Sequence, residues 1–529
     1  NTWNRSCAEC HATEVRRGFD GERWSTTWGD HGVTCEACHG AVEVTGEGHG
    51  PTPQRAAQRG WEEVCDSCHT RRTALTEAYR PGEPFLDHFV PSLVDGVHLS
   101  VEGHVVDEVF EGVPFWNARM HQAGVRCTGC HDPHSGSLRQ TGDALCAGCH
   151  AGEPPHDLHQ EPLACVDCHM PAATFMQRHE RRDHALAVPD PVLALELGTS
   201  SACDRCHADR PATAEAYAAA YPARATAPDR QRRRLWGAVA AGDPSVVAAA
   251  ASALSEGPGP HRATLAALAE PLAHHPALAA ALVEALGDHD PLVRLAAAQT
   301  LGNVGRRDVL PVALADDRRA VRVAAALALG PAADGHRAGA ERDAYLSLHQ
   351  GHPDVQTQRA SLAAERGDVA QARSLLDDAV ASAPRHVGAR RGRAVLRSAG
   401  GDAEGAVEDL QVAHAQRPAD AEVRFLLGLA LVATGDRDAA AVHLAEAADR
   451  HADAARNLGL LHAEAGRYAE AARALFQAEA LTPRDVRVHV ALAVVLRDWG
   501  RTAEARAAAR HALEIDPEHP VALSLLREL

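Results

Sequence analysis

The sequence predicts a mainly α-helical protein in two parts: a cysteine-rich module with much irregular structure, then an all-helical solenoid. All 14 cysteines lie within the first 210 residues. From about residue 213 alanine and leucine recur at helical spacing, and in the last third glycines recur at a nearly constant interval. A chain of 529 residues is too long for one core. We expect three domains, at 1–212, 213–340 and 341–529.

Every cysteine belongs to a C-x-x-C-H motif. Two thiols three residues apart on one helical turn reach the two vinyl groups of a haem, and the adjacent imidazole lies under the iron as its proximal ligand. Structural zinc, a thioredoxin-like motif or a disulfide framework does not require this triplet seven times. We therefore predict seven covalently bound c-type haems. The motifs, numbered 1 to 7 in chain order, are Cys7, Cys10 and His11; Cys35, Cys38 and His39; Cys65, Cys68 and His69; Cys127, Cys130 and His131; Cys146, Cys149 and His150; Cys165, Cys168 and His169; and Cys203, Cys206 and His207.

Histidines outside the motifs are candidates for the second axial position of each iron. Residues 1–210 contain 11 of them, enough for seven irons. His134 lies three residues after a proximal histidine, and His121 and His159 each lie six residues before a haem cysteine. With only three methionines in the chain, we favour all-histidine ligation and low-potential haems. The predicted distal ligands are His49, His88, His121, His134, His159 and His184, and His98 competes with His104 for the seventh iron.

The ligands of the irons decide between an electron carrier and an enzyme. Seven haems in so short a segment must lie close together, which favours a protein that passes electrons along a chain of haems. One alternative is a haem enzyme that reduces or oxidises a nitrogen or sulfur compound at one open iron. The chain contains no lysine, which excludes the C-x-x-C-K motif of some nitrite reductases, and we interpret the charged segment 178–183 as a solvated turn. A second alternative is a subunit of an extracellular conductive filament.

The formal charge of −18 is concentrated in the cysteine-rich part, where residues 1–210 hold 31 acidic residues against 17 arginines. Such a field disfavours nucleic acid and anionic membranes; it favours a cationic redox partner, and solubility explains it equally well. No segment approaches the roughly 18 apolar residues of a membrane span. Because c-type haem is attached outside the cytoplasm, we expect a periplasmic or cell-surface protein, with a targeting segment removed before Asn1.

The second half contains two kinds of repeat. Segments 287–302 and 315–330 each join an Asp-rich turn to an alanine-rich helix with arginine near its start, a pattern typical of HEAT-like repeats. Beyond about 341 the turn glycines follow a period near 34, which is the tetratricopeptide pattern, with about five repeats and a final cap helix. Such solenoids bind a peptide, a helix or another subunit, so we expect docking of a redox partner or another copy. The adjacent His274 and His275 are interpreted as solvent-facing. The turn glycines are Gly367, Gly401, Gly435, Gly466 and Gly500.

The stretches WNRSCAECHAT, TTWGDHGVTCEACHG, RMHQAGVRCTGCHDPHSG and CVDCHMPAATFMQRHERRDHALAVPDPVLALELGTSSACDRCHAD carry a family resemblance. The chain resembles extracytoplasmic multihaem cytochromes c with C-terminal HEAT-like and tetratricopeptide repeats. It is more distantly similar to octahaem and pentahaem cytochromes of the hydroxylamine oxidoreductase and nitrite reductase type. That resemblance implies that His184, in the DH after CHMP, ligates a neighbouring iron. Family members usually have a further C-x-x-C-H before the WN motif, so the resemblance leaves an eighth haem open.

Overall fold

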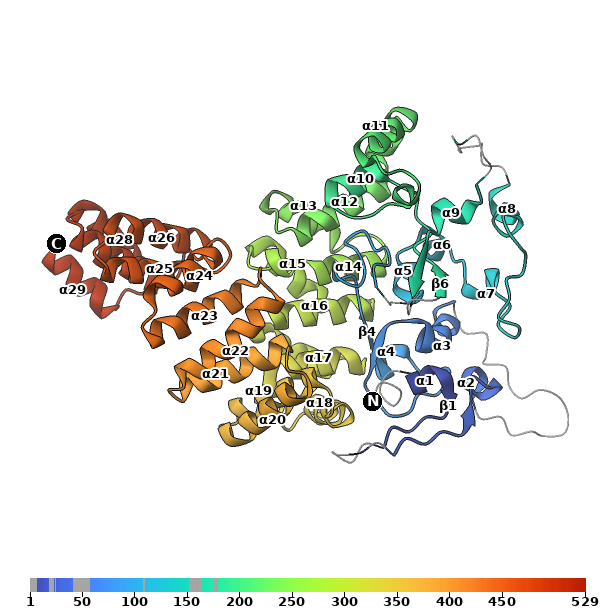
Figure 1. The fold of residues 1–529 in the computed structure, drawn as a ribbon, viewed down its shortest axis with the longest axis horizontal. Coiled ribbons are helices and arrows are strands. Elements are labelled where there is room, and N and C mark those ends of the chain that lie inside the picture. The colour runs from blue at the N-terminus through green and yellow to red at the C-terminus, as the bar shows by residue number, and fades with distance from the viewer. Residues whose placement is uncertain are drawn as a thin grey trace. The chain divides into compact units, whose positions relative to one another are not determined.

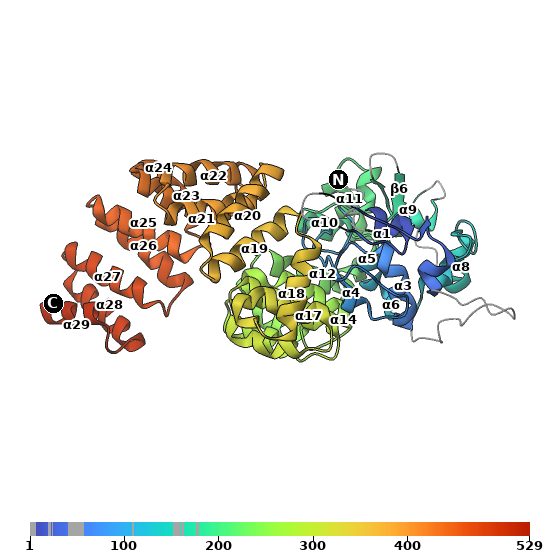
Figure 2. The same ribbon diagram turned by 90° about the horizontal axis from the view of Figure 1, so that it is seen from below.

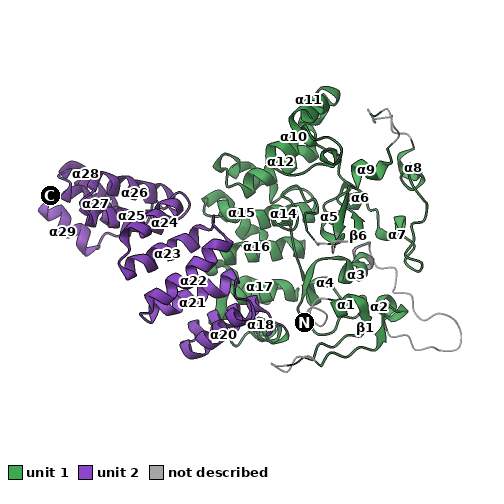
Figure 3. Cartoon of the chain, in the orientation of Figure 1, with its two compact units in different colours: residues 1–348 green, residues 349–529 purple. Residues whose placement is uncertain are grey.

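The computed structural model describes residues 7–18, 23, 25–40, 58–107, 110–151, 159, 163–175 and 179–529. It is mainly helical with little sheet (Figure 1), which confirms the predicted fold class. The chain divides into two compact units, residues 1–348 and 349–529 (Figure 3). Among the described residues, no helix is both long enough and apolar enough to cross a membrane.

The N-terminal part of the first unit consists of short helices joined by irregular segments. Its described sheet is limited to three antiparallel ribbons, β1 (Ala12–Thr13) with β2 (Asp30–His31), β3 (Arg72–Ala74) with β4 (Phe89–Pro91), and β5 (Ala172–Phe175) with β6 (His179–Arg182). The helices are α1 (Ala8–His11), α2 (Cys35–His39), α3 (Gln58–His69), α4 (Phe85–His88), α5 (Gly112–Trp116), α6 (Arg119–Gln122), α7 (Cys127–Cys130), α8 (Ala144–His150), α9 (Cys165–His169), α10 (Pro191–Leu197) and the 3-10 helix η2 (Ala202–Arg205).

Longer helices follow: α11 (Arg210–Ala220), α12 (Pro228–Ala240), α13 (Val247–Ala253), α14 (Gly259–Leu268), α15 (Pro276–Ala285), α16 (Pro291–Asn303), α17 (Arg319–Leu329) and α18 (Arg337–Leu348). Arginines near the starts of three of them explain the repeated Asp and Arg pattern. Arg262 pairs with Asp288, Arg294 with Asp316, and Arg322 with Glu341 at 2.7 Å. Each guanidinium therefore ties its helix to a carboxylate further along the chain.

The predicted boundary at 212 does not separate two cores. One continuous cluster of buried residues runs from Ala74 and Leu99 in the cysteine-rich part to Trp236 and the helices up to Ala338. Polar contacts cross the same junction, because the backbone N–H of Arg319 donates to the Asp87 carboxylate at 2.8 Å. The predicted boundary at 340/341 falls inside α18, and the second unit begins at residue 349.

The second unit is a tetratricopeptide-like solenoid of five consecutive helix pairs and a final helix, arranged one after another along the unit (Figure 2). Between the helices of each pair lies one of the predicted turn glycines, as at Gly435, where φ is +91°. That left-handed conformation suits glycine. The pairs are α19 (Pro353–Glu365) with α20 (Val369–Ser382), α21 (Val387–Ala399) with α22 (Ala403–Gln416), α23 (Ala421–Thr434) with α24 (Arg437–Ala447), α25 (Ala452–Glu464) with α26 (Tyr468–Leu481), and α27 (Val486–Asp498) with α28 (Thr502–Ile515), followed by α29 (Pro520–Glu528).

Close approach of paired helices leads to a first prediction, at Gly428. A Cβ at this position would lie 2.7 Å from Cγ of Leu444. A Gly→Ala substitution in an uncrowded helix stabilises the folded protein by about 0.5–1 kcal/mol. Where the added methyl group overpacks a tight core, the folded protein loses about 1–3 kcal/mol of stability. We expect Gly428→Ala to lower the free energy of unfolding, measured by denaturant titration. Gly459, whose Cβ would meet Leu475 at the same distance, should respond alike, and stabilisation of both variants would contradict this packing.

Candidate haem-binding sites

All seven C-x-x-C-H motifs lie at short helical segments, as predicted. Motifs 1, 2, 4, 5 and 6 lie at the small helices α1, α2, α7, α8 and α9, motif 3 ends α3, and motif 7 overlaps η2. One helical turn brings residues three and four apart onto the same face; where the histidine lies beyond the helix, as in motifs 4 and 7, its N–H still donates to the carbonyl of the first cysteine, as in His131 to Cys127 and His207 to Cys203 at 2.9 Å. Each motif thus presents two thiols and an imidazole together, as thioether attachment of a haem requires.

None of the 14 cysteines of the motifs is fully buried, and none forms a disulfide bond. A haem can add to a thiol only where its vinyl group can reach the sulfur atom, so a fully buried cysteine would contradict the predicted attachment. Five of the cysteines are exposed, namely Cys35, Cys38, Cys149, Cys165 and Cys206. The other nine are partly buried, namely Cys7, Cys10, Cys65, Cys68, Cys127, Cys130, Cys146, Cys168 and Cys203. All 14 therefore fit the predicted role, and the attachment of haem to each of them stays a prediction.

Two proximal histidines are already oriented by hydrogen bonds. The Nδ1 group of His169 donates to the backbone carbonyl of Ala187 at 2.9 Å. The Nδ1 atom of His69 lies 3.4 Å from the Glu111 carboxylate, and the hydrogen bond to Glu111 is the main cause that raises the pKa of His69. A hydrogen bond at Nδ1 fixes the ring and leaves Nε2 as the ligand atom, which is the usual arrangement of metal-bound histidine.

Three further histidines lie close to proximal histidines. His134 lies beside His39 with ring centres 6.2 Å apart and planes 9° from parallel. The ring centres of His184 and His131 are 6.3 Å apart. The third pair is His159 with His207, at 6.0 Å.

The spacing of these pairs is that of two imidazoles on one iron. A ligating nitrogen lies about 2 Å from its metal ion and the ring centre about 1 Å behind the nitrogen, so opposite ligands have ring centres about 6 Å apart. Direct stacking contact between the rings would be closer. The Nδ1 group of His184 also donates to the Arg182 carbonyl at 2.9 Å, which leaves its Nε2 for a metal. The residues at motifs 2, 4 and 7 therefore fit a haem held by two histidines.

The facing partners belong to motifs other than those nearest in sequence. His134 follows motif 4 by three residues but faces the histidine of motif 2, and His159 precedes motif 6 but faces the histidine of motif 7. A histidine so close to a proximal ligand has too short a tether to reach the opposite face of the same haem. The three segments that carry His134, His159 and His184 thus bring their histidines to motifs that are not their neighbours in sequence.

Other predicted distal ligands are placed differently. His88 has Nδ1 at 2.7 Å from the Thr76 hydroxyl and Nε2 at 3.0 Å from Glu83. His121 has Nε2 at 3.0 Å from Glu62 and Nδ1 at 3.3 Å from Gln122. Because both ring nitrogens of each are engaged, these two side chains would have to turn before either could bind iron, and their ligand roles stay predictions.

The two histidines that compete for the seventh iron share one feature. His98 has only Nδ1 tied, to Asp95 at 2.5 Å, and His104 has Nδ1 tied to Asp183 at 2.8 Å. Either histidine could use Nε2 as a ligand, so both remain candidates for the seventh iron. His49 lies outside the described residues.

The contact to His104 also corrects the interpretation of the charged segment as a solvated turn, because Asp183 makes this contact and residues 179–182 form β6, while Arg178 lies outside the described residues. Asp183 is buried, and burial opposes its ionisation, but the hydrogen bond and charge of His104 together with the backbone N–H groups of Ala185 and Val105 outweigh burial and lower the pKa of the carboxyl. Neither this contact nor that of Glu111 with His69 was predicted, because the partners are 79 and 42 residues apart in sequence.

Contacts link each motif to its neighbours. The thiol of Cys10 in motif 1 lies 3.8 Å from the carbonyl oxygen of Cys68 in motif 3, and Glu9 beside it pairs with Arg72 at 2.8 Å. Motif 2 approaches motif 3, since Cys68 is a cause, after burial, of the raised pKa of Cys38. The thiols of Cys65 and Cys127 interact directly, which joins motif 3 to motif 4 and raises the pKa of Cys127.

The remaining motifs continue from motif 4. Cys130 lies near Cys146 of motif 5, which after burial raises its pKa. Cys146 in turn contributes, after burial and Asp143, to raising the pKa of Cys165 in motif 6 to about 11, and the N–H of Cys165 donates to Asp143 just before α8 at 2.9 Å. The α9 helix of motif 6 contacts η2 of motif 7. All seven motifs therefore form one connected set.

A cavity of about 410 Å³ lies beside α3 in the first unit. Its walls include the carboxylates of Glu62 and Asp66, the ring of Trp116, and His121. Asp66 is buried, and burial raises its pKa well above the ordinary value. The cavity adjoins motif 3, in which Asp66 follows Cys65, and we regard it as part of the surroundings of that motif.

Comparison with known proteins identifies three kinds of repeat in the chain. The doubled CXXCH motif matches residues 121–154, HEAT repeats match residues 257–330, and the tetratricopeptide repeat matches residues 357–422, 425–485 and 458–520. These matches confirm the predicted repeats. No curated protein matches the chain.

Several solved structures are similar to parts of the chain. The crystal structure of MamA protein is 21% identical, with 31% of this chain and 92% of that chain covered and a TM-score of 0.29. The APC/C hetero-tetramer Cut9-Hcn1 is 19% identical, with 57% and 63% covered and a TM-score of 0.36. Pseudomonas aeruginosa pilF is 14% identical, with 40% and 99% covered and a TM-score of 0.34.

The fold and the motifs together define a class of protein. Paired C-x-x-C-H motifs indicate covalent binding of c-type haem, and tetratricopeptide repeats indicate protein–protein interaction. The chain is thus a helical protein with paired C-x-x-C-H motifs, which suggest a multihaem c-type cytochrome, and with HEAT and tetratricopeptide repeats.

Proposed function

We propose that this protein is an electron-transfer cytochrome with seven haems, most of them ligated by two histidines. The observation that supports it best is the set of three histidine pairs spaced for an iron between them, His39 with His134, His131 with His184, and His159 with His207. When bound, each haem supplies a one-electron couple at its iron. A pair of histidines on each iron blocks substrate binding there, which favours a carrier over an enzyme.

The contacts between motifs support an order of neighbours. Motifs 1 and 2 both approach motif 3, and motifs 3, 4, 5, 6 and 7 then follow in sequence order. In this proposal the protein holds its attachment sites as a line that forks at one end. Electrons would enter or leave at motif 7 and at motifs 1 and 2.

The proposal extends to partners and location. The tetratricopeptide repeats would dock a redox partner or another copy of the chain, since stacked helix pairs bind peptides and helices. The acidic cysteine-rich part favours a cationic surface on that partner. Because c-type haem is attached outside the cytoplasm, the proposal includes a location in the periplasm or at the cell surface. Assembly into a conductive filament would be one form of self-association.

Two measurements on one oxidised sample test the proposal. We expect pyridine haemochrome analysis to give seven haems per chain, and low-temperature electron paramagnetic resonance to give only low-spin iron. A high-spin signal from about one iron in seven would instead indicate an open site. Nitrite, hydroxylamine and sulfur oxyanions would then be screened as substrates. Turnover of one of them would show that the protein is a haem enzyme and would contradict the proposed role as an electron carrier.

A further inference from the structure

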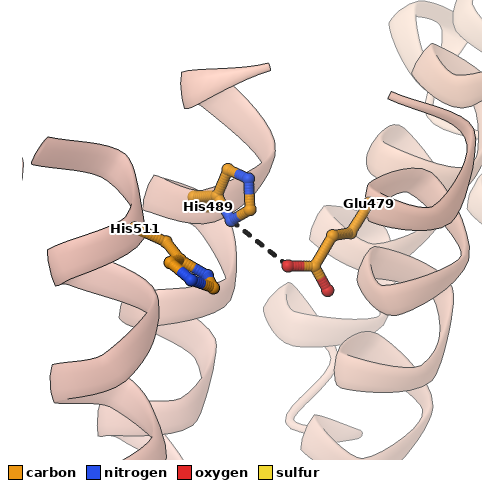
Figure 4. A group of neighbouring side chains, drawn as sticks. All are labelled: Glu479, His489 and His511. Atoms are coloured by element: carbon orange, nitrogen blue, oxygen red, sulfur yellow. Dashed lines mark ion pairs between the residues drawn. The ribbon is translucent and has the colours of Figure 1, made fainter. Parts of the chain in front are cut away.

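Three side chains of the second unit converge at the junction between two repeats (Figure 4). Glu479 comes from α26, His489 from α27 and His511 from α28. One ligand atom of each lies within 4.8 Å of the other two. The group thus joins the fourth helix pair to the fifth, far in sequence from every C-x-x-C-H motif.

The ring of His489 is oriented by its surroundings. Its Nε2 atom lies 2.7 Å from the backbone carbonyl oxygen of Pro483. A carbonyl oxygen only accepts, so Nε2 carries a proton, and Nδ1 is the ring nitrogen left for another partner. The side chain is only 4% exposed, and the buried Nδ1 atom makes no hydrogen bond.

That nitrogen faces the carboxylate of Glu479, with Nδ1 and Oε1 3.3 Å apart (Figure 4). Either a proton on Nδ1 or a metal ion between the two atoms stabilises this approach. Two ligands about 2.0–2.1 Å from one tetrahedral ion are themselves about 3.3 Å apart. The ring of His511 completes the group, with its centre 5.6 Å from that of His489.

We propose that Glu479, His489 and His511 bind a divalent transition-metal ion of the zinc type. Two imidazoles and one carboxylate are a common zinc ligand set, and the fourth position falls to water because His511 lies at the surface. The hydrogen bond from His489 to Pro483 orients the ring as supporting contacts of metal sites do. The ion would cross-link the fifth helix pair, α27 with α28, to the fourth pair.

Zinc binding by the intact, haem-loaded protein tests the proposal. The chelator-treated protein is dialysed against buffered free Zn²⁺, and bound zinc per chain is measured by elemental analysis. We expect the wild type to bind one zinc more than His511→Gln or Glu479→Gln, whose affinity falls by about tenfold or more. The matched control is His443→Gln, because His414 and His443 form another perpendicular pair, 5.1 Å apart, that belongs to no such group of three among the described residues.

Thermal unfolding of the same proteins provides a second readout. Zinc should raise the Tm of the wild type and of His443→Gln by several degrees, and leave His511→Gln unchanged, because only an intact site couples binding to folding. Equal zinc content in the wild type and both site variants would overturn the proposal. An unchanged Tm of the wild type in the presence of zinc would also overturn it, and His489 would then be a protonated ring paired with Glu479.

Discussion

Replacing His134 by alanine should convert about one iron in seven from low-spin to high-spin, because its partner His39 would be left as the only protein ligand of that iron. The side chain of His134 is 82% exposed and its nearest carboxylate, Asp132, is 4.0 Å away. The substitution should therefore leave the fold intact. The measurement is electron paramagnetic resonance of the oxidised variant beside the wild type, with haem content determined on both.

A matched control for this variant is His289→Ala. His289 is 84% exposed and belongs to the same unit, but it lies in the turn before α16 and faces no motif. Its removal should leave every iron low-spin. If His134→Ala is also entirely low-spin, His134 does not ligate iron, and the spacing of its ring from His39 has another cause.

The second large effect is expected at Asp409 in the solenoid. Its side chain is fully buried and accepts hydrogen bonds from Arg393 at 2.7 Å, from Arg397 at 3.0 Å, and from Arg390. Removing one partner of a buried ion pair costs about 3–5 kcal/mol, because the remaining charges stay buried and unpaired. We expect Asp409→Ala to lower the free energy of unfolding of the second unit by that amount, measured by circular dichroism in denaturant.

The control for Asp409 is Asp377, which also pairs with Arg393, at 2.9 Å, but is 53% exposed. Exposed pairs contribute at most about 1 kcal/mol, so Asp377→Ala should have little effect. Equal losses in the two variants would contradict the assignment of the stability to the buried carboxylate.

Low pH should cause part of the same loss of unfolding free energy in the wild type, because it protonates Asp409. Burial opposes ionisation of this carboxyl, but hydrogen bonds from Arg393 and Arg390 outweigh it and lower its pKa below the ordinary 3.8. A lowered folded-state pKa adds stability that is present above the unfolded pKa and lost as the pH falls through the folded value. Below about pH 4 the wild type should therefore lose more stability than Asp409→Asn, which has no such group to protonate.

Local sequence patterns predicted the motif helices and the repeats, because each depends on neighbours within a turn or within one period. The glycine spacing located every helix pair of the solenoid, for example the turn at Gly435. The partner of His39 was not predictable in this way. It depends on how the chain returns to the same place over the about 95 residues between His39 and His134, and no periodicity encodes that path.

The same difficulty applies to groups made of distant residues. Glu111 beside His69 and Asp183 beside His104 are separated in sequence by 42 and 79 residues. His121, in contrast, was predicted as a distal ligand from its sequence distance to a cysteine. In the structure its Nε2 atom contacts Glu62 of α3 instead. Sequence distance thus identifies which histidines are near some haem and leaves the choice of haem open.

The three facing histidine pairs also bear on how the chain gains its order. An iron held between His39 and His134 would close a loop of about 95 residues, in a part of the molecule with short helices and three two-stranded ribbons. A cross-link over a loop of this length removes unfolded-chain entropy equivalent to about 4–5 kcal/mol at room temperature. Metal coordination would then do for this segment what disulfide bonds do for small secreted domains, with the cysteines committed elsewhere.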